Sequence, residues 1–355
     1  MQIIVLGAHR SGTSMVTRLI NMMGAYFGLG ESSIGVSSDN PKGFWERGDV
    51  IAANDAILAH YGCAWDRLAQ WQGSEKIAPK DAQALAPIFN NMKNIILEMD
   101  ASRPWVMKDP RMCLTYPFWR PMLEMPVVVC VYRNPQEVAR SLKTRNQFSL
   151  SFSMALWEYY ATGVVNAIQR TPTIYVQHSA MLADPIATVQ KMYDDLTALG
   201  VRGLTLPTER EITSFVDPSL YRSRGNEALM TEMMTDTQKK LVAYVSGREK
   251  TLLNEWQKPS ELASDLILSL EQFSATQARL EQHYQLFSEV EQRKNELESQ
   301  MDGYKREIQH VQLRAQDTIA KLRADHDALR ASTSWRLGQK IVRFGRAVTF
   351  KGNPA

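Results

Sequence analysis

The chain has 355 residues, 44% of them hydrophobic, and a formal net charge of +3 at pH 7. This length is sufficient for a large folded domain, and so small a positive charge gives no reason to expect nucleic-acid binding. The sequence has no run of about 18 apolar residues, so we expect no transmembrane helix. Its three cysteines, Cys63, Cys113 and Cys130, do not have metal-ligand spacing. We therefore expect reduced thiols, no metal site and a cytoplasmic protein.

The composition changes sharply along the chain. Glycine and proline are scattered through the sequence up to about Pro259, whereas residues 261–330 contain no proline and a single glycine, Gly303. Leu, Glu, Gln, Lys and Arg dominate that second stretch, which is typical of a long helix. We predict a globular domain over residues 1–259, a coiled coil over residues 260–331 and a basic amphipathic tail over residues 332–355.

The N-terminus has the pattern of a strand, a glycine-containing loop and a helix. Residues 3–6 are a continuous apolar run of the kind found in buried parallel strands. Gly7 and Gly12 match the two glycines of G-x-x-x-x-G-K-[ST], but Thr13 stands where that motif has lysine and the cation is Arg10. Backbone N–H groups of such a loop and the helix dipole bind anions. We predict a phosphate-binding loop that differs from that of nucleoside triphosphatases.

A cluster of aromatic and charged residues, NPKGFWE, occupies residues 40–46. Loops at the ends of strands line the ligand crevice of α/β sheets. Glu46 is therefore a candidate general base. Lys42 and Trp45 are candidate acceptor contacts, with the tryptophan as a surface on which a sugar ring stacks. The alternative is an exposed glutamate and a core tryptophan.

Charged residues follow a short apolar strand predicted at residues 105–107. The next four residues are Lys108, Asp109, Pro110 and Arg111. Side chains at the carboxyl end of a parallel strand face the crevice. We expect Lys108 to hold a transferred group and Arg111 to contact an acidic acceptor, whereas Asp109 is expected to cap the following turn.

The clearest internal strand spans residues 127–132 and is followed by Arg133, Asn134 and Pro135. Asn134 and Pro135 suit the N-cap and first position of the next helix. At 1.5 Å per residue, Ser141 lies about 9 Å along that helix. An arginine and a serine so placed can hold one phosphate from two sides.

Taken together and in this order, these motifs resemble those of bacterial members of the sulfotransferase family that depends on 3′-phosphoadenosine 5′-phosphosulfate (PAPS). The matching stretches are residues 7–14, 40–46, 107–119 and 131–146, and the resemblance covers roughly residues 1–225. It implies an α/β fold with a parallel sheet and helices on both faces. The residues that it places on the 5′-phosphosulfate are Arg10, Ser11, Gly12, Thr13 and Ser14, and those on the 3′-phosphate are Arg133 and Ser141.

The sequence departs from the family pattern in two places. Cytosolic members have a histidine base in a Lys-x-His element, whereas residues 108–110 here are Lys-Asp-Pro. Glu46 resembles the glutamate base of the carbohydrate-acting branches. The late Arg-Lys-Gly element of cytosolic members is missing, and we expect Arg222 and Arg224 to contact the cofactor instead. The catalytic residues expected from the resemblance are Glu46, Lys108 and Arg10.

Apolar residues recur at alternating steps of four and three over residues 266–329, which is the pattern of a heptad seam. A three-residue step to Val290 and a four-residue step to Ile319 interrupt it. Three seam positions are polar, namely Gln277, Lys294 and His326. Polar seam residues favour few strands and a fixed register. We predict a parallel homodimeric coiled coil, and the alternative is a helix that folds back onto the domain.

The tail, residues 332–351, contains no acidic residue. Its cations are Arg336, Lys340, Arg343, Arg346 and Lys351, and the apolar residues of one face are Leu337, Ile341, Phe344 and Val348. A helix of this kind lies in the headgroup layer of an anionic membrane or docks on a protein partner. The string Ser-Thr-Ser-Trp-Arg-Leu resembles C-terminal elements of bacterial cell-surface glycan synthesis proteins. We expect a cytoplasmic protein at the inner face of the membrane.

The resemblance implies transfer of the sulfuryl group of PAPS, without a metal, to a hydroxyl or amine of an acceptor. The expected acceptor is a bacterial cell-surface glycan or its lipid-linked precursor. A P-loop kinase is one alternative, but it needs a loop lysine and an Mg²⁺-binding aspartate, for which only Asp109 is available. A non-catalytic coiled-coil scaffold is the other, and Glu46 alone separates it from an enzyme.

Overall fold

The structure is a computed structural model that describes residues 1–28, 43–73, 77–217, 234–255 and 257–349, with side chains through residue 346. The chain divides into two compact units, Met1–Ala275 and Thr276–Ala355. In chain order the elements are β1 (Gln2–Leu6), α1 (Thr13–Met22), α2 (Gly48–His60), α3 (Pro79–Ala84), α4 (Ala86–Asp100), β2 (Trp105–Lys108), α5 (Met112–Trp119), the 3₁₀ turn η2 (Arg120–Met122), β3 (Pro126–Tyr132), α6 (Pro135–Asn146), α7 (Leu150–Ile168), β4 (Thr173–Gln177), α8 (His178–Ala183), α9 (Pro185–Ala198), α10 (Glu209–Phe215), α12 (Asp236–Val245), α13 (Glu261–Ala331) and α14 (Thr333–Thr349).

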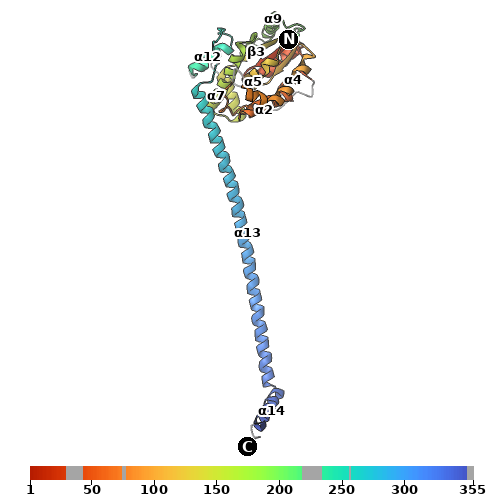
Figure 1. Cartoon of the computed structure of the whole chain (residues 1–355), viewed down its shortest axis with the longest axis vertical. Helices are drawn as coiled ribbons and strands as arrows, with labels where there is room; N and C mark the ends of the chain where they lie inside the picture. Colours follow the sequence, from red (N-terminus) through yellow and green to blue (C-terminus); the bar gives the residue numbers. More distant parts are fainter. Residues whose placement is uncertain (29–42, 74–76, 218–233, 256, 350–355) are drawn as a thin grey trace. The chain divides into compact units, whose positions relative to one another are not determined.

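The first unit is built on a four-stranded sheet in the order β2-β1-β3-β4, and every pairing is parallel. Helices cover both faces of this sheet (Figure 1). Because side chains alternate along a strand, Ile3 and Val5 pack with α1, α8, α9 and α10, whereas Ile4 and Leu6 pack with α2, α4, α5, α7 and α12. This explains why β1 is apolar at consecutive positions, and it confirms the predicted α/β fold.

Short-range sequence signals set the beginnings of several helices. The Asn134 side chain accepts a hydrogen bond from the Gln136 N–H at 2.9 Å, and Pro135 is the first residue of α6, as predicted. Asp184 caps α9 in the same way, and Thr235 forms a capping box with Gln238 at the start of α12. These caps fix where α6, α9 and α12 begin.

The first turns of α13 belong to the globular unit. Ala263 and Ile267 are buried in the cluster that covers the second face of the sheet. The buried Glu158 carboxylate accepts from the Ser260 N–H at 2.7 Å, and Glu271 accepts from the Ala69 N–H at 2.9 Å. The compact unit thus continues past residue 259, where the sequence alone places the boundary, to Ala275.

The second unit contains the remainder of α13 and α14. The long helix predicted over residues 260–331 is confirmed, since α13 runs unbroken from Glu261 to Ala331. Between Thr276 and Arg346, no side chain that the structure describes is buried. Among the described helices, none is long and apolar enough to cross a bilayer.

Candidate functional site

Three of the predicted site motifs lie at one edge of the sheet. In a parallel sheet the carboxyl ends of all strands lie at the same edge. After β1 the chain pairs β2 on one side of it and then β3 on the other, so the crevice of the fold opens beside β1. The glycine-containing loop follows β1, Lys108 ends β2 and Arg133 follows β3. The topology therefore brings together motifs that are far apart in the sequence.

The loop after β1 has the backbone of an anion cradle. Gly12 is the N-cap of α1 at φ +89° and has no side-chain oxygen to offer the N–H groups of the first turn. A Cβ atom on Gly7 would lie 2.7 Å from the Val131 carbonyl oxygen, so a side chain there would push the loop away from β3. Ser11 and Thr13 are buried. These features leave the positive end of α1 facing the crevice.

Two arginines and a serine meet beside this loop. Arg10 Nε donates to Ser141 Oγ at 2.9 Å, and an Arg133 terminal nitrogen donates to the Arg10 carbonyl oxygen at 2.9 Å. Arg133 also pairs with Glu137, one helical turn along α6, at 3.2 Å. The predicted phosphate ligands Arg133 and Ser141 therefore share a partner, Arg10. Guanidinium and hydroxyl groups of this kind are suited to binding an anionic ligand.

Lys108 and Glu46 form a buried ion pair on the other side of the loop. Lys108 Nζ donates to Glu46 Oε1 at 2.5 Å, to the Phe44 carbonyl oxygen at 2.6 Å and to Ser14 Oγ at 3.2 Å. The lysine side chain is 1% exposed and that of Glu46 13%. Burial lowers the pKa of Lys108, and the neighbouring carboxylate of Glu46 opposes this shift. The pair holds a carboxylate next to the first turn of α1.

Asp109 has a structural environment. Its side chain is fully buried and accepts from Asn54 Nδ2 at 2.9 Å and from the backbone N–H of Arg111 at 3.0 Å. The Arg111 guanidinium pairs with Asp109 at 3.1 Å and with Asp55 at 2.6 Å. Asp109 thus caps the turn after β2, as expected from sequence. The expected contact of Arg111 with an acceptor stays a prediction.

Trp45 packs against the body of the unit. Its ring meets Phe27 edge-on, with centroids 5.3 Å apart, and the Arg18 guanidinium lies 4.6 Å from the centre of the ring. Its backbone has a positive φ of 53°, which L-residues rarely adopt. Stacking of a sugar ring on Trp45 stays a prediction. Three other predicted contacts, Lys42, Arg222 and Arg224, lie outside the described residues.

Three residues of the site were missed from the sequence. His9, in the loop, approaches the Tyr160 hydroxyl at 3.1 Å, and its ring lies 4.8 Å from that of Trp65. The Tyr160 hydroxyl donates to the Trp65 carbonyl oxygen at 2.8 Å. Burial and then the nearby cations, Arg111 foremost, hold the pKa of His9 well below its usual value. Only the position of His9 between the two loop glycines could have drawn attention to it.

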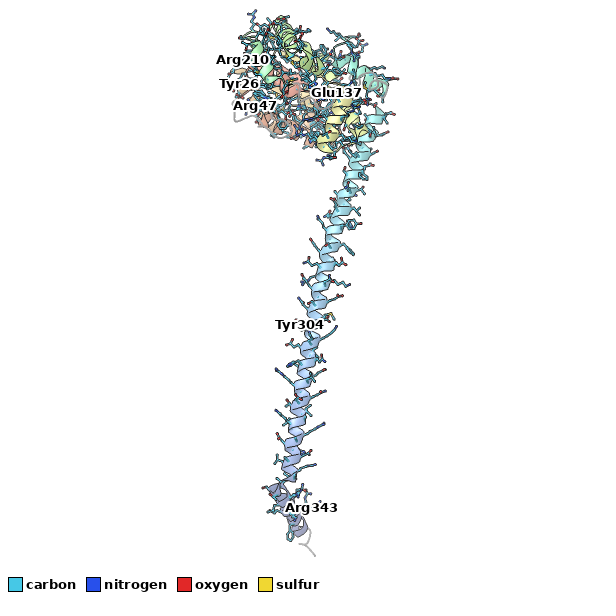
Figure 2. All side chains as sticks on the ribbon, turned by 180° about the vertical axis from the view of Figure 1, so that it is seen from behind. Tyr26, Arg47, Glu137, Arg210, Tyr304 and Arg343 are labelled. Atoms are coloured by element: carbon cyan, nitrogen blue, oxygen red, sulfur yellow. The ribbon has the colours of Figure 1, made fainter. Side chains whose placement is uncertain are left out.

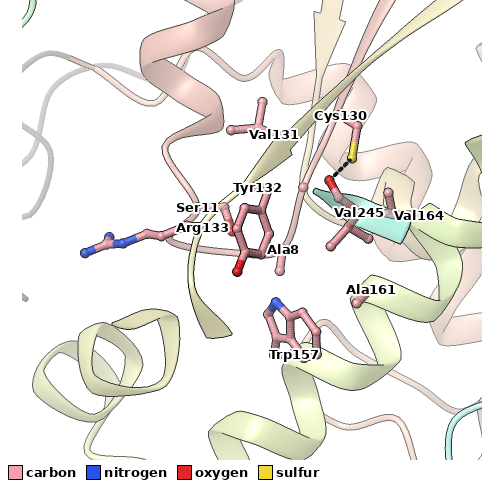
Figure 3. A pocket seen from close by; sticks show the side chains of 11 residues that line it. Ala8, Ser11, Cys130, Val131, Tyr132, Arg133, Trp157, Ala161, Val164 and Val245 are labelled. Atoms are coloured by element: carbon pink, nitrogen blue, oxygen red, sulfur yellow. Dashed lines mark hydrogen bonds between the residues drawn. The ribbon is translucent and has the colours of Figure 1, made fainter. Parts of the chain in front are cut away.

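A small pocket lies behind the loop (Figure 3). Tyr132 and Trp157 face each other across it, with Ala8 and Ala161 beside them. Cys130 Sγ donates to the Val245 carbonyl oxygen at 3.3 Å along one wall. Its cavity volume is about 10 Å³, roughly the room for one water molecule. This pocket is therefore too small for a nucleobase.

His178 lies on the far side of the loop, directly after β4. A Cβ on Gly12 would come within 2.4 Å of His178 Cδ2, so the imidazole packs against the N-cap of α1. Burial, followed by the charge of Arg133, lowers the pKa of His178 to about 3. In the described residues, no group of three or more His, Cys, Asp or Glu side chains is arranged to hold a metal ion.

Comparison with known proteins gives one family match. The model of the sulfotransferase family matches residues 2–198, more than half of the chain. Two similar solved structures are the sulfotransferase domain from the Synechococcus PCC 7002 olefin synthase and the sulfotransferase domain from the curacin biosynthetic pathway. The first is 13% identical with a TM-score of 0.37, over 76% of this chain and 94% of that one. The second is 12% identical with a TM-score of 0.36, over 76% and 96%. No curated protein matches the chain.

Proposed function

Since the chain belongs to the sulfotransferase family, we propose that it transfers the sulfuryl group of PAPS to a hydroxyl or amine of a glycan acceptor. One observation carries this proposal. The edge of the sheet beside β1 combines an anion cradle, an Arg10 that contacts both Ser141 and Arg133, and a buried ion pair between Glu46 and Lys108. Such a site can bind a donor that carries two anionic groups, and its carboxylate can accept a proton from the acceptor.

The residues present fit PAPS at both of its charged ends. The first turn of α1, with Arg10, Ser11 and Ser14 around it, is the cradle for the 5′-phosphosulfate. Arg133 and Ser141 are the ligands for the 3′-phosphate. When bound, PAPS supplies an activated sulfuryl group and leaves as 3′-phosphoadenosine 5′-phosphate. The family generally uses this donor.

Glu46 is the group that we assign to take the proton of the acceptor. Its carboxylate accepts from Lys108 Nζ, which also contacts Ser14 of the loop that binds the phosphosulfate, and a general base must lie near the reacting group in this way. Lys108 is a buried cation that contacts Ser14, and at this place it stabilises negative charge on the transferred group. Arg10 acts in the same sense from the opposite side of the loop.

The two alternatives fit the site less well. A kinase needs a loop lysine and a carboxylate open to Mg²⁺. Thr13 occupies the lysine position, and Asp109 is enclosed by Asn54 and Arg111. A non-catalytic scaffold has no need for the buried pair of Lys108 and Glu46, because desolvating two charges is costly. The glycan acceptor rests on the likeness of Glu46 to the base of carbohydrate-acting members.

The test is transfer of ³⁵S-labelled sulfate from PAPS, in the absence of divalent metal, across fractions of bacterial glycans and lipid-linked precursors. We expect label in a carbohydrate fraction with the natural protein, and labelling about 10²–10⁴-fold slower with Glu46→Gln. Transfer of phosphate from ATP, with no transfer from PAPS, would contradict the proposal. Transfer only to non-carbohydrate acceptors would support sulfuryl transfer from PAPS but contradict the glycan acceptor.

A further inference from the structure

The second unit presents an apolar stripe that its own chain leaves exposed. Side chains stand out from α13 along its length, Tyr304 among them (Figure 2). The large exposed apolar residues at seam positions are Leu280, Tyr284, Phe287, Val290, Leu297, Met301, Tyr304, Ile308, Val311, Ile319, Leu322 and Leu329. Most helical stability in proteins comes from packing of such a stripe. This helix therefore needs a partner along its seam.

The spacing of the stripe identifies the partner as another helix of the same kind. Steps of three and four place the stripe on a seam with a mean period of 3.5 residues, which is how two helices wind around each other. Residues 290–315 form its longest uninterrupted block. The steps at Val290 and Ile319 change the local winding, so each is best matched by an identical step on the partner. A second copy in parallel and in register provides this match.

The charges beside the seam agree with the same arrangement. In a parallel pair, the residue before each a position (g) meets the residue after the next d position (e) of the other helix. With Lys294 as an a position, Arg293 of one chain meets Glu298 of the other, and Asp325 likewise meets Arg330. The two interruptions divide the seam into three blocks, residues 266–287, 290–315 and 319–329. Within these blocks, none of the other g–e pairs joins like charges. The flanks are thus self-complementary in this register.

The seam layer at Lys294 lowers the stability of the coiled coil and limits the number of helices that can assemble. Lys294 lies at an a position, and its Nζ is 3.7 Å from Glu298 Oε1 of the same helix. A lysine at this position keeps its ammonium at the edge of a two-stranded seam, whereas three or four strands would bury it. We infer that the protein is a parallel, in-register homodimer held by residues 277–329. Both α14 helices then lie at the same end of the paired α13 helices.

Single cysteines on the full-length protein test the inference. Leu322→Cys places a thiol at a d position, where the two copies face each other, and Ala324→Cys is the matched control on the outer surface. The native cysteines are buried and do not interfere. Under mild oxidation, Leu322→Cys should form a disulfide-linked dimer about 10²-fold faster than Ala324→Cys, because facing thiols have a raised effective concentration. Leu280→Cys, with Gln282→Cys as control, repeats the test near the other end of the seam.

Light scattering on the natural protein gives the mass independently. We expect twice the 40.3 kDa of one chain. A mass of one chain would overturn the inference. The seam would then pack against its own chain or against a different protein. A dimer mass without cross-linking at either d position would overturn the parallel register and point to antiparallel helices. A mass of three or four chains would overturn the two-stranded assembly.

Discussion

The two units of this protein use their apolar and charged residues in opposite ways. In Met1–Ala275 the sheet is buried on both faces by the chain itself, and Lys108 and Glu158 are charged groups that have partners inside it. In Thr276–Ala355 the apolar seam of α13 is exposed from Leu280 onward. The first unit is complete as one chain, whereas the second has the composition of an interface. The residues that build the folded core and those of the exposed seam thus lie in separate parts of the sequence.

Ending the chain before the first turns of α13 has the largest expected effect, a loss of stability of the first unit. A chain that ends at Pro259 loses the buried Ile267, worth about 1.5–3 kcal/mol. It also removes the Ser260 N–H from the buried Glu158 carboxylate, which costs about 1–3 kcal/mol. We expect its free energy of unfolding in urea to be about 2.5–6 kcal/mol below that of a chain ending at Ala275. Equal stability of the two chains would place the boundary at residue 259.

Removal of the proposed base, Glu46, has the next largest expected effect. Glu46→Gln keeps the shape of the side chain and removes its ability to accept a proton. We expect turnover to fall by about 10²–10⁴-fold, while the affinity for 3′-phosphoadenosine 5′-phosphate changes little. Glu124→Gln, at an exposed glutamate of the same unit, is the control and should be fully active. Near-normal turnover of Glu46→Gln would move the role of base to another residue.

Loss of a 3′-phosphate ligand has a smaller and more selective effect. Arg133→Ala should weaken binding of 3′-phosphoadenosine 5′-phosphate by about 2–3 kcal/mol, the scale of a charge-assisted hydrogen bond. Adenosine 5′-phosphosulfate, which has no 3′-phosphate, should bind almost as before. Arg140→Ala, at an exposed arginine of the same helix, is the matched control. Calorimetry that shows equal losses for both nucleotides would refute the assignment.

Acid should destabilise the first unit through His178. Its pKa is about 3 in the folded protein and near 6.5 when unfolded, so below pH 6.5 the unfolded chain takes up a proton that the native one does not. The free energy of unfolding should therefore fall by about 1.4 kcal/mol per pH unit between pH 6 and 4 on account of this group. His178→Gln should reduce the measured slope by about one proton. An unchanged slope in urea titrations would mean that His178 titrates alike in both states.

Binding of the tail to an anionic membrane has the smallest expected effect. Within the described residues its helix carries Arg336, Lys340 and Arg343 beside the exposed Leu337 and Phe344. Each cation near an anionic surface contributes about 1 kcal/mol, so one tail binds weakly. We expect the full chain to float with anionic vesicles at low salt, and a chain ending at Arg330 not to float. If the full chain stays at the bottom of the gradient, the membrane prediction is wrong, and docking of the tail on a protein partner is the remaining prediction.

Local signals in the sequence predicted the frame of the fold well. The apolar runs of β1 and β3, the cap at Asn134 and the lysine at the end of β2 all depend on neighbouring residues, and the structure has them where expected. The sequence also predicted that Arg133 and Ser141 would hold one phosphate from two sides. It did not predict that both would contact Arg10.

What the sequence did not reveal depends on long-range contacts. Tyr160 meets His9 across 151 residues of chain, and Glu271 binds Ala69 across 202. No pattern within a window of sequence marks such pairs, since each residue type is common and its partner is chosen by the tertiary fold. The same reason explains why residues 260–275 look like the start of a coiled coil, although Ile267 packs in the core.

Calorimetric titration of the full chain with 3′-phosphoadenosine 5′-phosphate, in the presence of a metal chelator, tests the proposed donor site directly. The site described here predicts one nucleotide bound per chain without magnesium, at an affinity about 10²-fold above that for adenosine 5′-phosphate, because Arg133 and Ser141 hold the 3′-phosphate. Binding that requires magnesium, or equal affinity for the two nucleotides, would contradict a PAPS site at this edge of the sheet.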